Sequence, residues 1–125
     1  VDPTLLDARS ETWPLESADA VVCINMIHIA PWAACVGLLR GASRLLPPGG
    51  PLVLYGPFSI HGDSTAASNV EFDRALRAQN EEWGVRELAD IERSAAEFGL
   101  ELDQVVPRPA HNHVVVLRQK RRSDA

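Results

Sequence analysis

The sequence predicts an α/β domain, in which helices connect the strands of a mostly parallel sheet. Ala20–Ile24 is apolar and rich in β-branched residues, which is typical of a parallel strand covered by helices on both faces. A second apolar run, Pro51–Tyr55, follows after a helical pattern, and a strand, helix, strand order predicts a right-handed crossover. The 125 residues of the chain are enough for one domain.

The first half of the chain is expected to add one short strand and one long helix to these runs. Thr4–Leu6 is a short apolar run and is the first strand candidate. Pro31 suits the first turn of a helix, because its missing N–H costs nothing there. Apolar residues between positions 35 and 46 form one helical stripe, which Pro47–Gly50 ends.

The second half is expected to contain two helices and a pair of strands. Gly56–Thr65 has no periodicity and is expected to be a loop. Ser68–Ala78 begins with capping-box spacing, which predicts a short helix. Val85–Gly99 has an apolar helical face and ends in a glycine suited to the C′ position. Glu101–Val106 and Asn112–Arg118 are expected to form an antiparallel pair at the sheet edge.

The distribution of charge argues against nucleic acid as a partner. Seventeen acidic side chains outnumber twelve Lys and Arg, and the formal net charge is −5. Four of the basic residues lie in the last eight positions, so the rest of the chain is more acidic still and repels a phosphate backbone. Because no apolar run is long enough for a bilayer and no secretory leader is recognisable, we expect a cytoplasmic protein that binds no membrane.

Polar residues follow three of the predicted strands, where open α/β sheets bind their ligands. Asp7 can accept a hydrogen bond from an exocyclic amine while the next backbone N–H serves a ring nitrogen; a helix cap or a turn acid is an equal alternative. Asn25 offers both a donor and an acceptor, although such asparagines are often turn formers. Tyr55 can hydrogen-bond a substrate or be a core residue with a polar tip.

His28 is the histidine that lies at this edge of the predicted sheet. Its ordinary pKa suits a general base acting on a hydroxyl, thiol or amine, and the alternative is a packing or capping residue. His111 and His113 form an H-x-H pattern whose side chains would share one face of a strand, but no third ligand accompanies them and no zinc site is expected.

Several catalytic schemes are excluded by what the sequence lacks. It contains no G-x-S-x-G, C-x-x-C, H-E-x-x-H or Walker lysine motif. Its one lysine, Lys120, lies near the C-terminus, which argues against Schiff-base chemistry. Cys23 and Cys35 stand in apolar surroundings and are expected to be buried thiols.

Segments in the first half resemble class I S-adenosylmethionine-dependent methyltransferases. The segments are Asp7–Arg9, Trp13–Leu15, Ala18–Val22, Met26–Ile29 and Arg44–Leu54. In that class the corresponding motifs, in order, are an acidic residue after strand three, a Leu-Pro-Phe-like turn and a strand that begins with Asp. A histidine after the end of that strand and an R-x-L-x-P-G-G junction follow. The resemblance implies a Rossmann-like class I methyltransferase fold, with a mostly parallel sheet and a terminal antiparallel strand, and S-adenosyl-L-methionine as cofactor.

A closer resemblance is to the uncharacterised methyltransferase-like protein 26 family, a domain of unknown function. It is carried by Ile24–Trp32, Tyr55–Phe58, several positions of Ser68–Arg77 and Trp83–Arg86, and it extends from Thr4 to Leu117. At positions 109–112 the sequence departs from the Pro-Ala-Asn-Asn text of that family, so no role is expected for His111.

The resemblance implies a role for each candidate site residue. The residues expected to bind the cofactor are Asp7, which would meet the adenine amine, Ala8, which would contact the ring through its backbone, and Asn25 and Met26 at the methionine end. The residues expected to shape the acceptor pocket are Tyr55, Phe58, Asn69 and Arg77. His28 is the catalytic candidate, needed only if the acceptor must lose its proton early. No metal is expected.

The glycine-rich loop after the first strand and the ribose-binding acid after the second are missing from these 125 residues. We therefore expect residues 1–118 to be the part of a methyltransferase domain from strand three onward, and residues 119–125 to be a basic tail. The strand at 20–24 would then be an open edge, through which two copies of the chain would associate.

These observations leave three functions open. The first is a methyltransferase acting on an unidentified small molecule. The second is a non-catalytic binding or assembly module that keeps the fold without the cofactor loop. The third, a nicotinamide-dependent domain, explains the Pro48–Gly50 junction less well.

Overall fold

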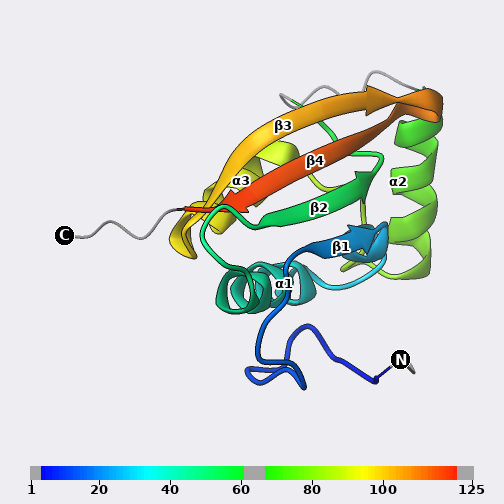
Figure 1. Cartoon of the computed structure of the whole chain (residues 1–125). Coiled ribbons are helices and arrows are strands. Elements are labelled where there is room, and N and C mark those ends of the chain that lie inside the picture. The colour runs from blue at the N-terminus through cyan, green and yellow to red at the C-terminus, as the bar shows by residue number, and fades with distance from the viewer. Residues whose placement is uncertain (1–3, 61–66, 121–125) are drawn as a thin grey trace.

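A four-stranded mixed sheet forms the centre of the molecule (Figure 1). The computed structural model describes residues 4–60 and 67–120. The strands are β1 (Val21–Ile24), β2 (Pro51–Gly56), β3 (Leu100–Arg108) and β4 (Asn112–Gln119). Their order in the sheet is β1-β2-β4-β3. β1 and β2 are parallel, whereas β4 is antiparallel to both of its neighbours, so the parallel pair and the terminal antiparallel pair are both confirmed.

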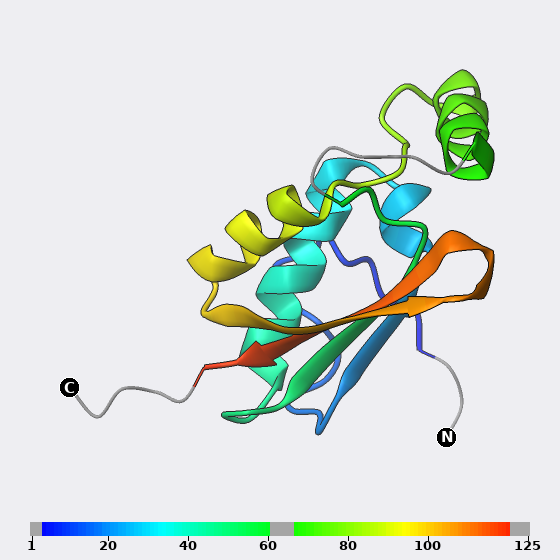
Figure 2. The same ribbon diagram turned by 90° about the horizontal axis from the view of Figure 1, so that it is seen from above.

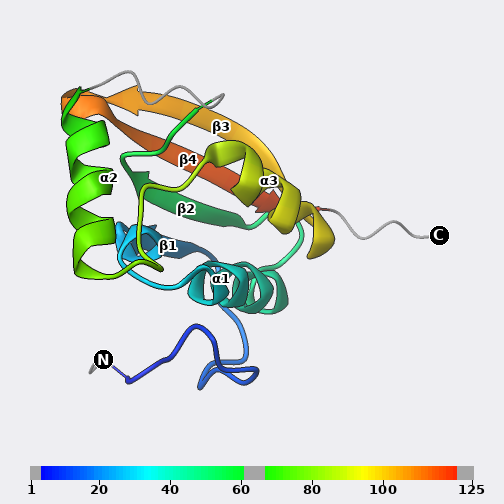
Figure 3. The same cartoon turned by 180° about the vertical axis from the view of Figure 1, so that it is seen from behind.

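Two long helices cover one face of this sheet, and a third stands at its end. The helices are the 3-10 helix η1 (Met26–His28), α1 (Trp32–Leu45), α2 (Ala67–Gln79), α3 (Leu88–Glu97) and the 3-10 turn η2 (Pro109–His111). α1 and α3 lie together on one side of the strands (Figures 2 and 3). α2 crosses the edge of the sheet at which β1 and β2 end (Figure 1). This edge is where an open α/β sheet binds its ligands.

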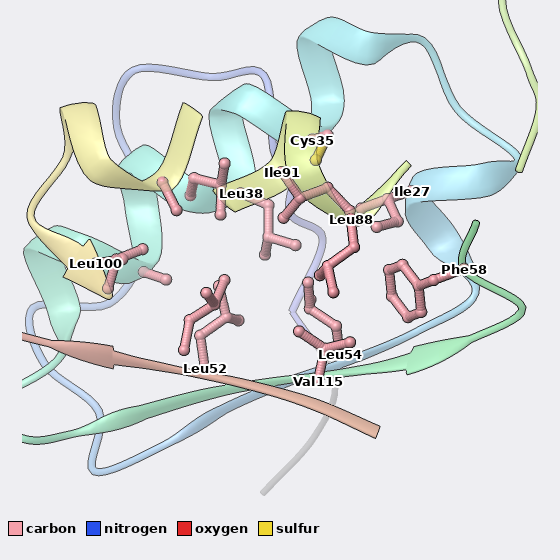
Figure 4. Packing of buried hydrophobic residues seen from close by; sticks show 14 of the residues in the cluster. Ile27, Cys35, Leu38, Leu52, Leu54, Phe58, Leu88, Ile91, Leu100 and Val115 are labelled. Carbon is pink, nitrogen blue, oxygen red and sulfur yellow. The ribbon is translucent and has the colours of Figure 1, made fainter. Parts of the chain in front are cut away.

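The hydrophobic core lies between the sheet and the two covering helices (Figure 4). In the antiparallel register Leu52 pairs with Leu117 and Leu54 with Val115, and all four side chains are buried. They face Ile91, Leu38 and other apolar residues of α1 and α3. Alternate residues of paired strands share one face, so this face of β2 and β4 is the one that the helices bury.

β1 differs from the expected strand, because the described helices cover only one of its faces. Val22 and Ile24 point away from the core and are 63% and 62% exposed, while Val21 and Cys23 pack against it. The apolar composition of the strand therefore did not indicate two covered faces. It leaves large apolar side chains on the surface, which is unusual enough to mark a contact surface.

The strand predicted at Thr4–Leu6 is wrong, because residues 4–20 contain neither helix nor strand. Leu5 is 97% exposed, and the segment lies beside α1 rather than beside a strand that could form a ladder with it. Side chains of α1 hold it there, since the Arg40 guanidinium donates to the Arg9 carbonyl at 3.1 Å.

Two glycines of α1 make room for this N-terminal segment. A Cβ on Gly37 would lie 2.1 Å from the Ala8 carbonyl oxygen, and a Cβ on Gly41 would lie 2.1 Å from the ring of Trp13. Both distances are far below van der Waals contact. The segment can lie directly on the helix only because these two positions, one turn apart, carry no side chain.

The helix predicted from Val85 to Gly99 begins three residues late, at Leu88. The backbone N–H groups of Val85 and Arg86 donate to the side chains of Asp73 and His28, at 2.8 and 3.0 Å. These distant acceptors hold residues 85–87 outside the helix. Gly99 has φ +75°, so its predicted position after the helix end is confirmed.

α1, α2, β2 and the β3–β4 pair lie where the patterns predicted them, within a few residues at each end. The capping role of Ser68, most of the loop at 56–65 and the end of the basic tail lie outside the described residues or side chains. The H-x-H expectation is wrong: Ala110 and His111 have φ near +60° in the turn before β4. His111 therefore does not share a strand face with His113.

Candidate functional site

An open cavity of about 930 Å³ lies between the N-terminal segment, β1 and α1. Three of the four predicted cofactor residues line it, namely Asp7, Ala8 and Met26. Most of the other lining side chains are apolar, and cavities with apolar walls and a few polar groups are typical of small-molecule sites. Asn25 is not among the lining residues.

Asp7 is the acidic group of this cavity. Its carboxylate accepts hydrogen bonds from the Arg9 backbone N–H at 2.9 Å and from the Arg9 guanidinium at 3.0 and 3.2 Å. These bonds hold the pKa of the Asp7 carboxyl below its usual range. Both side chains are more than half exposed, so the pair is accessible to solvent and to a ligand.

One cavity residue comes from the second half of the chain. Trp83 lies in the linker between α2 and α3, whereas every other lining residue falls between positions 5 and 45. The next residue, Gly84, donates its N–H to the His28 carbonyl at 2.9 Å. The linker thus reaches both the cavity and η1.

A second, buried group surrounds His28; we call His28, Gly56, Phe58 and Arg86 the His28 cluster. The side chain of His28 is fully buried. Its ring meets the ring of Phe58 edge to face, with 5.0 Å between centroids and 70° between planes. Its Nδ1 accepts a hydrogen bond from the Arg86 backbone N–H at 3.0 Å.

Arg86 attaches the α2–α3 linker to η1. Its guanidinium donates to the carbonyl oxygens of Ile27 at 2.8 Å, of Ala30 at 2.6 Å and of Glu82 at 2.8 Å. It also lies over the ring of Trp32, at 5.6 Å from the centroid, which adds a cation–π contact. Arg86 is a site residue that the sequence analysis missed, because Trp83–Arg86 entered it only as part of a resemblance.

The surroundings of His28 decide its protonation state. Burial lowers its pKa to about 4, so the ring is neutral near pH 7. A neutral imidazole carries one N–H, and because Nδ1 accepts the Arg86 N–H, the proton belongs on Nε2. Nε2 is buried without a partner among the described residues. It lies 2.8 Å from the place where a Cβ on Gly56 would be.

The predicted acceptor residues separate into two groups. Phe58 belongs to the His28 cluster and is buried. Tyr55 ends β2, and its carbonyl accepts the Asn25 N–H at 2.9 Å, with Asn25 in the left-handed region at φ +61°. The structure therefore brings Asn25, His28, Tyr55 and Phe58 together at one edge of the sheet.

Asn69 and Arg77 lie on α2 and make other contacts. Asn69 is buried, and its side chain donates to the His111 carbonyl at 3.2 Å. Arg77 pairs with Asp73 at 2.9 Å and lines a separate polar hollow of about 440 Å³ together with Arg86. Their roles in an acceptor pocket stay predictions.

The thiols and the remaining histidines add no further reactive group. Cys35 is buried and Cys23 is half-buried; burial raises the pKa of both thiols, that of Cys35 to about 12, so neither is a ready thiolate. Among the described residues, no three metal-binding side chains gather. In the same part of the chain, no helix is long and apolar enough to cross a membrane.

The described fold matches part of the fold of class I S-adenosylmethionine-dependent methyltransferases. The structure is similar to human N-acetylserotonin methyltransferase in complex with SAM, with a TM-score of 0.78, 17% identity, and coverage of 94% of this chain and 33% of that one. It is similar to an O-methyltransferase family 2 protein from Planctomyces limnophilus DSM 3776 in complex with apigenin, with a TM-score of 0.77, 21% identity, and coverage of 90% and 33%.

A third similar structure is mitomycin 7-O-methyltransferase MmcR, with a TM-score of 0.76, 21% identity, and coverage of 90% and 32%. The chain thus spans about a third of the length of these methyltransferases. A family model matches residues 1–119. The chain belongs to DUF938, a family described as a protein of unknown function.

Proposed function

We propose that this protein is a methyltransferase that uses S-adenosylmethionine and methylates a small molecule. The observation that carries the proposal is the position of η1 between the two groups described above. Met26, at one end of η1, lines the 930 Å³ cavity, and His28, at its other end, belongs to the buried cluster. Methyl transfer needs the donor and the acceptor side by side and in line. A cofactor in the cavity and an acceptor at the His28 cluster would lie at the two ends of this three-residue helix.

The cavity suits S-adenosylmethionine in size and chemistry. Its apolar walls match an adenine ring and a thioether chain, and the ionised Asp7 carboxylate is an acceptor for the exocyclic amine. The Arg9 guanidinium is paired with that carboxylate, but the ion pair is exposed to solvent and its interaction is weak. When bound, S-adenosylmethionine supplies a methyl group on a positively charged sulfur. The residues of this chain hold it, exclude water and orient the acceptor.

The first test is binding of S-adenosylhomocysteine, followed in the ¹H–¹⁵N spectrum of the protein. Millimolar ligand is expected to shift the signals of Asp7, Ala8 and Met26 together. Asp7→Asn removes the charge at the same size and is expected to weaken binding about tenfold. Asp19→Asn, at another exposed acid, is the matched control and is expected to have no effect.

NADH serves as the competing ligand in the same titration. Shifts of the cavity signals by NADH but not by S-adenosylhomocysteine would replace the proposal with the nicotinamide-dependent alternative. If neither ligand shifts them, the binding-module alternative takes its place. Methyl transfer itself is then assayed with the longest polypeptide that the gene encodes, using radiolabelled S-adenosylmethionine and a mixture of phenols, thiols and amines.

A further inference from the structure

We infer that His28 is a hydrogen-bond donor, held in that state by Arg86, and that the methyl acceptor presents an ionised oxygen to it. Arg86 is a positioning residue in this proposal, because it acts through His28. The inference rests on the proposed function only in assuming that a methyl acceptor binds beside His28. The state of the His28 ring is a property of this chain and is tested without cofactor or activity.

The hydrogen bonds to the main chain and ring of His28 fix which nitrogen carries the proton. The Arg86 backbone N–H donates a hydrogen bond to His28 Nδ1 at 3.0 Å, and the Gly84 N–H donates to the His28 carbonyl at 2.9 Å. Two backbone N–H groups of the linker, two residues apart, therefore bond to the same histidine. A proton on Nδ1 would oppose the Arg86 N–H and lose that bond, so the neutral ring keeps its proton on Nε2.

The guanidinium of Arg86 keeps the linker in the place that this bond requires. Its bonds to Ile27 and Ala30 join the linker to η1 and the residues after it, and its bond to Glu82 closes the linker on itself. A planar guanidinium can satisfy carbonyls in several directions at once, which a lysine ammonium does with less precision. Arg86 thus holds its own backbone N–H opposite His28.

The free N–H of His28 points to a ligand oxygen. His28 is fully buried, and its Nε2 has no partner among the described residues. Its neighbours at that end are the apolar ring of Phe58, the backbone of Gly56 and the Asn25 side chain; a Cβ on Gly56 would lie 2.8 Å from Nε2 and 2.9 Å from Asn25 Oδ1, so only glycine lets β2 approach the ring this closely. A buried donor without a partner is costly. A ligand that accepts a hydrogen bond there recovers that cost.

This donor selects the chemistry of the acceptor. A ring whose Nδ1 is occupied and whose Nε2 already bears a proton cannot remove a proton from a hydroxyl group. The acceptor must therefore reach the site already ionised, as carboxylic acids do at neutral pH and as phenols and enols do more readily than alcohols. The anionic oxygen forms the new bond to the methyl carbon while the carbon–sulfur bond breaks and its electron pair stays on sulfur. The opposite charges cancel, and no proton remains to be placed.

Long-range ¹H–¹⁵N spectra of the histidine rings test the first half of the inference. His28 is expected to show the Nε2–H form and to keep it from about pH 8 to about pH 5. An Nδ1–H form, or protonation of His28 above about pH 5, would overturn the inference.

Arg86→Lys and Arg93→Lys form a matched pair for the positioning role. Arg93 lines the same polar hollow but pairs only with the exposed Asp90 among the described side chains. Arg86→Lys is expected to give a mixture of both His28 tautomers while the fold persists, and Arg93→Lys none. If Arg86→Lys unfolds the protein, the ring spectra of the unsubstituted chain still decide the tautomer. An unchanged His28 in folded Arg86→Lys would refute the role of Arg86.

4-Nitrophenol is the probe for the second half, because its ionised form has its own visible absorption. Binding near His28 is expected to lower the pKa of the probe, since the donor stabilises the phenolate. 4-Nitroanisole, its methyl ether, is expected to shift the His28 signals less. A raised or unchanged probe pKa, or no effect of 4-nitrophenol on the His28 signals, would refute the ionised acceptor. Neither result depends on S-adenosylhomocysteine, so this inference and the proposed function fail separately.

Discussion

The cavity side and the His28 cluster lie at the two ends of η1, and they are built in opposite ways. The cavity wall at residues 4–13 is mostly exposed and rests on α1 through two glycines and a few bonds from arginine side chains. In the His28 cluster, His28, Gly56 and Phe58 are buried and Arg86 is half-buried. The α2–α3 linker donates to His28 from its backbone and to the Ile27 carbonyl from the Arg86 side chain.

This difference indicates which half of the site is rigid. Segments with few buried contacts open at low cost in free energy, whereas packed and hydrogen-bonded groups open only with the whole domain. The His28 cluster is therefore pre-organised, and the cavity wall at residues 4–13 can adjust. Four predictions test this difference in rigidity, first at the His28 cluster and then at the cavity.

The largest expected effect is a pH dependence of stability that comes from His28. Its pKa is about 4 in the folded protein and near the ordinary 6.5 in the unfolded chain, so the unfolded chain binds a proton first as the pH falls. The stabilisation is complete above about pH 6.5 and disappears towards pH 4. Between about pH 7 and about pH 4.5, the free energy of unfolding is expected to fall by about 2–3 kcal/mol through this residue.

Urea unfolding of the unsubstituted protein and of His28→Gln measures this difference. The variant has no titrating ring, so its loss of stability over the same range should be smaller by that amount. His111→Gln is the control, because His111 is exposed, and it should follow the unsubstituted protein. Parallel pH curves for the unsubstituted protein and His28→Gln would mean that the His28 ring is accessible to protons when folded.

Gly56→Ala is expected to destabilise the cluster by about 2 kcal/mol, because overpacking a well-packed site costs about 1–3 kcal/mol. The new Cβ would lie 2.8 Å from His28 Nε2 and 2.9 Å from Asn25 Oδ1, and neither neighbour can move without breaking the cluster. Gly49→Ala is the control: its Cβ meets nothing within 4 Å, although its φ is +80°. It measures the backbone cost alone, about 1 kcal/mol. Equal urea midpoints for the two variants would show a loose cluster.

Most of the fold was predictable from local patterns, and the exceptions have one cause. α1 has an apolar stripe that ends at Pro47–Gly50, and β2 and β4 contain apolar runs, so neighbouring residues determine these elements. The start of α3 depends instead on acceptors 12 and 58 residues away. Thr4–Leu6 is as apolar as a short strand, but a strand also needs a neighbouring strand to pair with. A local sequence pattern does not show whether such a neighbour is present.

The position of His28 in the fold was predictable, but its surroundings were not. His28 stands at the carboxyl edge because it follows an apolar strand, which periodicity reveals. Its protonation state depends on the backbone of Arg86, and arginines at a linker give no signal of which carbonyls they will bind. The residue type alone suggests a general base. The hydrogen bond that Nδ1 accepts from Arg86 is what indicates a hydrogen-bond donor at Nε2.

Gly37→Ala is expected to have a smaller effect on stability than Gly56→Ala, although its clash is closer. The Cβ would lie 2.1 Å from the Ala8 carbonyl oxygen, but the exposed segment can lift off α1, and alanine adds about 0.5–1 kcal/mol of helix propensity. The free energy of unfolding should change by less than about 1 kcal/mol, while the ¹H–¹⁵N signals of residues 5–13 shift and S-adenosylhomocysteine binding is lost. A loss of stability as large as that of Gly56→Ala would place this segment in the rigid part.

The smallest expected effect is that of Arg9→Ala, which removes the partner of Asp7 without touching the fold. The pKa of the Asp7 carboxyl should rise towards its usual value, because the hydrogen bonds from Arg9 hold it down. If that carboxylate receives the adenine amine, freeing it should tighten S-adenosylhomocysteine binding at most a few-fold, since an exposed pair competes weakly. NMR titration of Asp7 and of the ligand measures both effects. Weaker binding in Arg9→Ala would mean that Arg9 itself contacts the ligand, and the cavity would then be pre-organised by an ion pair much as the cluster is by Arg86.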